Sequence, residues 1–269
     1  MFSSRQGGFS QIPTIVKNII IINVLFFLLQ NVLGDKADMY LALHYWESPY
    51  FRWWQLFTHM FMHANVGHIF FNMFALWMFG SILENVFGPK RFLIFYLVCG
   101  LGAAICHLSV LGFEFHKLHA AFLYYQEHPS LTSYAQFLKR SSFTEEVFMR
   151  VLSFWQQNPD CTDCAQQSIQ FINQKYALML NEATVGASGA VFGLLFAFGY
   201  LFPEMELMLI FPPIPIKAKW FVAGYAAIEL FSGIQNSAGD NIAHFAHLGG
   251  MLFAFILLRA WKSRTTRWN

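Results

Sequence analysis

A serine and a histidine in two separate apolar segments carry the chemistry that this sequence suggests. Ser188 lies in a Gly-Ala-Ser-Gly tetrad, residues 186–189, near the start of the hydrophobic run 183–202. His247 lies at a similar distance from the start of a second hydrophobic run, 242–260. A serine hydroxyl is a poor nucleophile until a neighbouring base takes its proton, and neutral imidazole suits that role. The pair therefore predicts a nucleophile and its general base, held below a membrane surface.

Two further polar residues fall at a comparable depth in the run 61–83. His68 and Asn72 are four residues apart and share one face of a helix. At a rise of about 1.5 Å per residue, Ser188 and His247 each lie within the outer third of a membrane. Polar side chains are costly in hydrocarbon and usually face a cavity or one another. We expect His68, Asn72 and the backbone N–H of Ser188 to donate hydrogen bonds to an oxyanion formed during acyl transfer.

Small residues recur along both runs at spacings that let helices pack closely: Gly186, Gly189 and Gly193 in the first, and Gly250 and Ala254 in the second. Such spacings are common packing surfaces between membrane helices, and by themselves they indicate packing alone. Close approach of these two helices is also what would bring Ser188 to His247, so the structural and the chemical interpretations support each other.

No acid is expected to orient His247. Glu229 lies in the run 217–233, but the sequence names no partner for it, so a two-residue Ser–His system is the simpler prediction. His244 is a rival base three residues earlier, and we prefer His247 because only His247 is followed by close-packing glycines. The sequence lacks the H-E-x-x-H pattern of zinc proteases, so we expect neither a metal nor another cofactor.

The composition places the chain among multi-span membrane proteins. Of its 269 residues, 56% are hydrophobic and 19% aromatic, and only 12% are charged, whereas a soluble domain carries about 25% charged residues. A net charge of +2 without a basic cluster does not suggest nucleic-acid binding. The first apolar run lacks a small-residue cleavage site after it, so we expect it to be retained as a first span.

Six candidate spans follow from the hydrophobic runs: 14–33, 61–83, 91–111, 184–202, 217–233 and 242–260. The lysines and arginines next to the span ends on one side, such as Lys17, Lys90, Arg91, Lys217 and Arg259, are cytoplasmic if both termini are, and the first and last loops on the opposite side are richer in acids. The sequence therefore predicts an all-α membrane protein with six transmembrane helices, in one membrane domain over residues 1–269.

The segment 112–183 differs from the rest of the chain because it is polar and mixes aromatic with charged residues. Residues 144–157 have apolar side chains at helical spacing. We expect a helical, extracytoplasmic insertion between the third and fourth membrane helices, acting as a lid, as a surface for substrate docking, or as neither. Cys161 and Cys164 form an isolated C-x-x-C within it, and a local disulfide and an idle thiol pair are equally compatible with the sequence.

Taken together, these motifs resemble those of the rhomboid family of intramembrane serine proteases. Residues 186–189 match the family's G-x-S-G motif, and residues 246–250 match its A-H-x-x-G motif. The second-span pattern of two histidines and an asparagine is present as His63, His68 and Asn72. The resemblance extends to framework residues at the junction of the second and third spans, which are Gly80, Glu84, Gly88 and Arg91.

The resemblance implies a six-helix bundle that cleaves single-pass membrane proteins without metal or nucleotide. It implies that Ser188 is the nucleophile and His247 the general base, with His68 and Asn72 at the oxyanion site. It also places the ring of Phe192 against the catalytic histidine. The Trp-Arg pair often found in the family's first loop is Trp54-Gln55 in this chain.

Two other function classes remain as alternatives. One is a catalytically silent rhomboid-like protein that binds membrane proteins, and the intact Ser–His pair argues against it. The other is a metal-dependent membrane protein that uses the histidines. We expect single-pass membrane proteins and the lipid bilayer as partners and no nucleic acid, in a multi-pass protein of a bacterial inner membrane. The natural substrate and the oligomeric state stay open.

Overall fold

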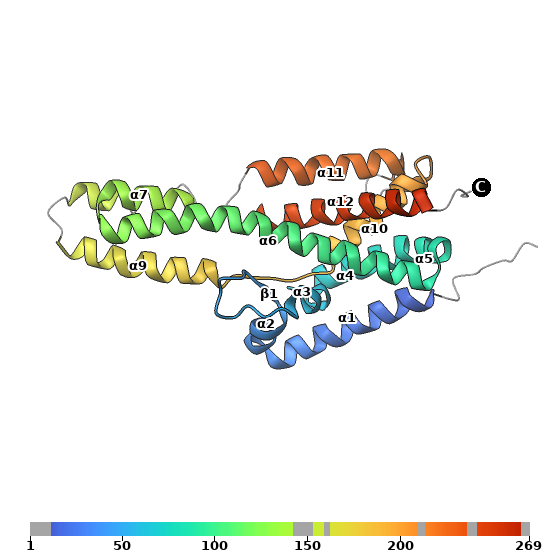
Figure 1. Cartoon of the computed structure of the whole chain (residues 1–269), viewed down its shortest axis with the longest axis horizontal. Coiled ribbons are helices and arrows are strands. Elements are labelled where there is room, and N and C mark those ends of the chain that lie inside the picture. The colour runs from blue at the N-terminus through green and yellow to red at the C-terminus, as the bar shows by residue number, and fades with distance from the viewer. Residues whose placement is uncertain (1–11, 142–152, 159–161, 209–212, 236–240, 265–269) are drawn as a thin grey trace, which may run out of the picture.

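The computed structural model describes residues 12–141, 153–158, 162–208, 213–235 and 241–264, most of which are helical (Figure 1). Two short two-stranded sheets, β1·β2 and β3·β4, are the β-structure in this part of the chain. The elements are α1 (Thr14–Leu33), α2 (Asp35–Leu41), β1 (Leu43–His44), α3 (Gln55–Thr58), η1 (His59–Phe61), α4 (Val66–Ala75), η2 (Leu76–Gly80), α5 (Ser81–Phe87), α6 (Pro89–Glu127), α7 (Leu131–Arg140), α9 (Thr162–Leu180), β2 (Ala183–Thr184), α10 (Ser188–Leu201), β3 (Glu206–Met208), β4 (Pro215–Lys217), α11 (Ala218–Gln235) and α12 (Asn241–Arg264).

Four helices within the described residues are long and apolar enough to cross a membrane: Thr14–Leu33, Val66–Phe87, Pro89–Glu127 and His244–Lys262. The second of these combines α4, η2 and α5. Helix α10 is apolar but has only 14 residues, which gives a length of about 21 Å against a hydrocarbon core of about 30 Å. The chain is thus a helical membrane protein, and its division into six spans stays a prediction.

Two helices end or begin at other residues than the predicted spans do. The third span was expected to end at residue 111, but α6 continues to Glu127, just before His128 and Pro129. A residue that precedes proline is disfavoured in the helical conformation, so the helix stops there. The fourth span was expected from residue 184, but α10 begins only at Ser188 because Gly186 has a φ of 138°, which is not helical.

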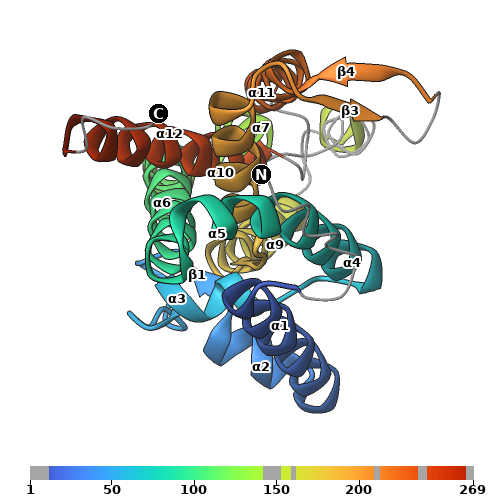
Figure 2. The same ribbon diagram turned by 90° about the vertical axis from the view of Figure 1, so that its right-hand side faces the viewer.

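Helix α10 lies at the centre of the bundle, in contact with α5, α6, α11 and α12 (Figure 2). Its Leu194, Ala197 and Phe198 are fully buried in the main hydrophobic core. A Cβ added to Gly250 on α12 would collide with the backbone of Gly189 on α10. The two helices therefore approach as closely as the spacing of small residues predicts.

The first loop is anchored by Gln55, the residue that stands where the family often has arginine. The Gln55 side chain is fully buried. Its Oε1 accepts a hydrogen bond from Arg52 N at 3.0 Å, and its Nε2 donates to the carbonyls of Tyr50 (3.0 Å) and Met39 (3.2 Å). An uncharged amide, which both donates and accepts, thus ties together the backbone of the loop between α2 and α3.

A second hydrophobic core joins the outer part of α6 to α7 and α9, beyond the membrane bundle (Figure 1). Its fully buried members include Tyr125, Phe137 and Ile172. The Tyr125 hydroxyl lies 2.5 Å from Ser168 Oγ, which is a hydrogen-bond distance. Tyr134 also belongs to this core, and burial raises the pKa of its phenol to about 12. The described parts of the segment 112–183 are mostly helical, but residues 142–152 and the side chains of Cys161 and Cys164 lie outside the described residues.

Candidate active site

Ser188 is the first residue of α10, at the end of an extended segment. Before it, β2 pairs with β1, and Gly186 N–H donates to the His59 carbonyl at 2.9 Å. The first N–H groups of a helix have no partner within the helix, and the helix dipole makes this end electropositive. The serine therefore sits where backbone donors are available to a developing negative charge.

His247 meets Ser188 from the neighbouring helix α12. Its Nε2 lies 2.9 Å from Ser188 Oγ, which is a hydrogen-bond distance. The ring of Phe192, one turn after Ser188, stacks on the imidazole with centroids 4.0 Å apart and an interplanar angle of 9°. Facing helices thus bring the two residues together, and an aromatic ring fixes the plane of the histidine.

The prediction that no acid lies beside His247 was wrong. Glu229 on α11 accepts hydrogen bonds at a single carboxylate oxygen, Oε2, from His247 Nδ1 (2.9 Å) and His244 Nδ1 (2.6 Å). The sequence shows Glu229 as an acid in an apolar run, which is a signal for a functional site. Its partner was missed because the pairing depends on how α11 and α12 are rotated about their axes.

The hydrogen bonds to Glu229 determine the tautomer of His247. A carboxylate only accepts hydrogen bonds, so Nδ1 of His247 carries the proton. In the neutral ring, Nε2 then has a free lone pair, and this lone pair faces the hydroxyl of Ser188. The geometry is that of a serine with a base ready to accept its proton.

His68 lies against the same site from α4. A Cβ placed on Gly186 would lie 2.9 Å from His68 Cε1, 3.1 Å from His68 Nε2 and 3.4 Å from Ser188 Oγ. A side chain at position 186 would therefore enter the space between the His68 imidazole and the Ser188 hydroxyl. Only glycine fits at this position. The buried His63 packs edge-on against His68, with ring centroids 5.1 Å apart.

Asn72 is buried one helical turn below His68. Its Nδ2 donates to the His68 carbonyl at 3.0 Å, so one of its two amide N–H bonds is used within α4. The structure therefore brings Ser188, His247 and His68 together, and it links Asn72 to the backbone of His68. A role for Asn72 at an oxyanion rests on its second N–H.

The cluster of Glu229, His244 and His247 also has the composition of a metal site. Their ligand atoms all lie within 4.8 Å of one another. Two ligands of a tetrahedral zinc at about 2.05 Å are separated by about 3.3 Å, whereas the carboxylate oxygen lies 2.6 and 2.9 Å from the two imidazole nitrogens. These separations fit shared protons better than a metal ion between the ligands.

Comparison with known proteins gives the family of this chain. The model of the rhomboid domain matches residues 50–115 and 166–262, which include Ser188, His247, His68 and Glu229. The chain belongs to the rhomboid family. It is 36% identical over 84 residues to the rhomboid protease GlpG of Klebsiella pneumoniae, a stretch that covers 31% of this chain and 30% of that protein.

Other relatives of the rhomboid family match over similar stretches. The rhomboid protease GluP of Bacillus subtilis is 31% identical over 98 residues, which cover 35% of this chain and 19% of GluP. A GlpG of Yersinia pestis is 30% identical over 98 residues, 36% of this chain and 35% of that protein. The matched stretches thus span about a third or less of the length of these relatives.

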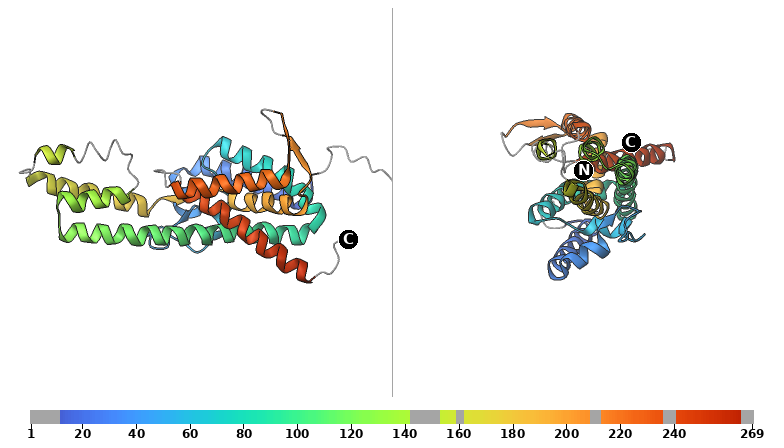
Figure 3. Two further views of the ribbon diagram at one scale, coloured as in Figure 1. Left: turned by 90° about the horizontal axis from the view of Figure 1, so that it is seen from above. Right: turned by 90° about the vertical axis from the view of Figure 1, so that its left-hand side faces the viewer.

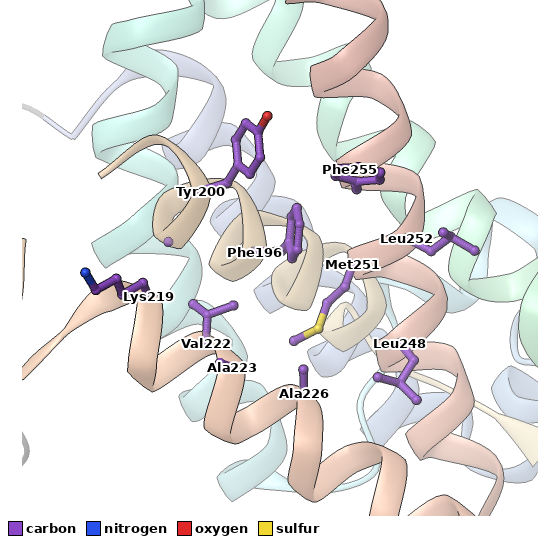
Figure 4. Close-up of a pocket in the computed structure, with 11 residues that line it drawn as sticks. Phe196, Tyr200, Lys219, Val222, Ala223, Ala226, Leu248, Met251, Leu252 and Phe255 are labelled. Atoms are coloured by element: carbon purple, nitrogen blue, oxygen red, sulfur yellow. The ribbon is translucent and has the colours of Figure 1, made fainter. Parts of the chain in front are cut away.

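An apolar cavity of about 590 Å³ lies beside the candidate site, between α10, α11 and α12 (Figure 4). Leu248, which follows His247, and Met251, one turn further along α12, line one side of it. Figure 4 shows Phe196 of α10 and Val222 of α11 on its other sides. Helix α11 is therefore less tightly packed against its neighbours than α10 is against α12.

A larger cavity, of about 960 Å³, lies between the site and the helices outside the bundle. His68 and Thr184 line it from the bundle, and Arg140 and Lys175 line it from α7 and α9. The rhomboid domain model leaves residues 116–165 unmatched. Arg140 lies in this unmatched segment, so part of the cavity wall comes from residues outside the match to the rhomboid domain.

Proposed function

We propose that this protein is an intramembrane serine endopeptidase that cleaves single-pass membrane proteins, with Ser188 as nucleophile and His247 as general base. The observation that carries the proposal is the 2.9 Å contact between Ser188 Oγ and His247 Nε2, made by two apolar helices of a rhomboid-family protein. The names of the relatives, rhomboid proteases from three bacteria, support the same activity.

The proposed reaction is acyl transfer in two steps. Ser188 Oγ attacks the carbonyl carbon of the scissile bond while His247 Nε2 takes the hydroxyl proton. The oxyanion is stabilised by the backbone N–H of Ser188 and by donors from His68 and Asn72. His247 then gives the proton to the leaving amine, and water hydrolyses the acyl-enzyme with His247 again acting as base.

We further propose that both termini are cytoplasmic and that the site opens toward the outer side of a bacterial inner membrane. The start of α1 and the end of α12 lie at the same end of the bundle, opposite to α7 and α9 (Figures 1 and 3). Ser188, the first residue of α10, and His68, near the start of α4, lie toward the end nearer to α7 and α9. This arrangement agrees with the distribution of basic residues.

The alternative is a rhomboid-like protein that binds membrane proteins without cleaving them. A silent relative has no need to keep a serine hydroxyl in hydrogen-bond contact with an unprotonated imidazole nitrogen. The contact between Ser188 and His247 therefore favours the enzyme.

The proposal is tested with purified protein in liposomes and a fluorescent single-pass substrate. Ser188→Ala and His247→Ala should each lower kcat/KM by about a thousandfold or more, while Ser81→Ala in α5 leaves it unchanged. A fluorophosphonate should label the wild type and not Ser188→Ala. Cleavage by Ser188→Ala at the rate of the wild type would contradict the proposed mechanism. Loss of cleavage on adding a chelator would favour a metal-dependent reaction.

A further inference from the structure

We propose that Glu229 is a positioning residue for His247, so that the site works as a group of three side chains, Ser188, His247 and Glu229. This inference rests on the proposed function and deepens it. The carboxylate would hold His247 in the tautomer and orientation in which Nε2 accepts the Ser188 proton, and it would stabilise the ring once that proton has been transferred.

The first support is the position of His247 between two hydrogen-bond partners. Its Nδ1 donates to Glu229 Oε2 at 2.9 Å, and its Nε2 faces Ser188 Oγ, also at 2.9 Å. The ring is thus held at both nitrogens, while Phe192 covers one face at 4.0 Å. Since α10 supplies the contacts from Ser188 and Phe192 and α11 supplies the contact from Glu229, rotation of the imidazole away from Ser188 would break interactions on more than one side.

The second support is charge. When His247 takes the Ser188 proton it becomes an imidazolium ion in a site that is mostly shielded from water. Its side chain is 15% exposed and that of Glu229 is 9% exposed. An opposite charge at hydrogen-bond distance in such surroundings stabilises the ion pair formed in the transition state much more than in water.

The third support is that His244 holds the carboxylate itself. Its Nδ1 lies 2.6 Å from the same Oε2, so two N–H groups on one face of α12 hold the end of the Glu229 side chain. This arrangement favours the charged carboxylate over the protonated acid, because a charged oxygen accepts both hydrogen bonds. His244, which the sequence offered as a rival base, contacts Glu229 and thereby supports the orientation of His247.

Glu229→Gln is the sharpest test because it removes the charge and keeps the size of the side chain. The glutamine amide can donate to Nδ1, which would move the His247 proton to Nε2 and leave Ser188 without a base. We expect kcat to fall about a hundredfold with little change in KM. Glu229→Asp should recover part of the loss, and His244→Ala should cost less than Glu229→Gln. Glu204→Gln, the same change at an exposed acid far from the site, is the matched control.

The dependence of kcat/KM on pH separates positioning from a purely structural role. Among the residues that the structure describes, the titratable groups that face His247 are His68 from α4, His244 from α12 and Glu229 from α11. Without the negative charge the imidazolium is less favoured, so the acidic limb of the profile in Glu229→Gln should move to lower pH. An unmoved limb together with full kcat would overturn the inference.

Nitrogen-15 NMR of labelled protein tests the same point without any substrate. The wild type should show His247 with its proton on Nδ1, and Glu229→Gln should show a shift toward the Nε2 tautomer at unchanged thermal stability. If the tautomer is as expected but Ser188→Ala cleaves like the wild type, the proposed protease function fails and the geometric role of Glu229 stands. If Ser188→Ala is inactive but Glu229→Gln retains its kcat and tautomer, only the role of Glu229 fails.

Discussion

The contact between Ser188 and His247 depends on how closely two backbones can approach. Gly250 on α12 faces the backbone of Gly189 on α10, and a Cβ at Gly250 would overlap the Gly189 carbonyl. No flexible side chain is available to move aside, so α12 itself would have to shift. A small displacement at a catalytic pair has a large cost in rate.

Gly250→Ala should therefore lower kcat/KM by about a hundredfold and lower stability by about 1–3 kcal/mol, as overpacking of a close contact does. Activity assays and thermal unfolding in detergent measure the two effects. Gly224→Ala on α11 is the matched control, because a Cβ there meets nothing within 4 Å. That control should be neutral or slightly stabilising, and similar behaviour of the two variants would show that close packing is not what Gly250 provides.

The sequence predicts some residues of the site and not others, for a physical reason. Ser188, His247 and His68 could be found because their residue types and their depth along apolar runs are both readable from the chain. The partner of Glu229 could not be found in this way. It depends on the rotation and tilt of α11 against α12, which follow from packing of many side chains rather than from any local pattern.

At the scale of elements, the start of α1 is held by an acid on another helix. Glu84 of α5 is buried, and its carboxylate accepts hydrogen bonds from the backbone of Ile15 (3.0 Å) and Val16 (2.8 Å). These N–H groups belong to the first turn of α1, where the helix supplies no acceptor. The side chain of Pro13, the residue before this turn, makes no capping hydrogen bond. Glu84, which is distant in the sequence, takes over the role of the N-cap residue.

Glu84→Ala should lower the free energy of unfolding by about 2 kcal/mol or more, because two backbone donors lose their acceptor in a low-dielectric site. Activity measured well below the unfolding temperature should be nearly normal, since Glu84 is outside the site. Glu127→Ala, at an exposed acid at the end of α6, should change stability by no more than about 0.5 kcal/mol. Equal melting temperatures for the two variants would contradict the capping role.

The boundaries of elements show a similar division between local and distant causes. The end of α6 near Pro129 could have been predicted, because proline restricts the residue before it. The late start of α10 could not be predicted as firmly. The segment before Ser188 is extended because β2 pairs with β1, a strand more than a hundred residues earlier in the chain, and that pairing has no signature in the sequence of either strand.

At the scale of the whole molecule, the helices outside the bundle extend the surroundings of the site. Together with the outer part of α6, α7 and α9 build their own hydrophobic core, and they contribute Arg140, Lys175 and Met179 to the wall of the 960 Å³ cavity that His68 also lines. A substrate whose scissile bond reaches Ser188 would carry its outer flanking segment past this wall. The charge of the wall should then affect which flanking sequences are accepted.

Arg140→Glu should lower the ratio of kcat/KM for a substrate with an acidic outer flank to that for one with a basic flank, by about three- to tenfold. The change reverses one charge on the cavity wall, so acidic segments are repelled and basic ones attracted. Lys139→Glu is the matched control, because Lys139 is an exposed neighbour on α7 that does not line the cavity. Labelling of Ser188 by a small fluorophosphonate should be the same in both variants, since the probe has no flanking segment.

The same shift in preference for both variants would mean that general surface charge acts on the substrate. An unchanged ratio of kcat/KM values in Arg140→Glu would mean that the flanking segment does not pass through this cavity.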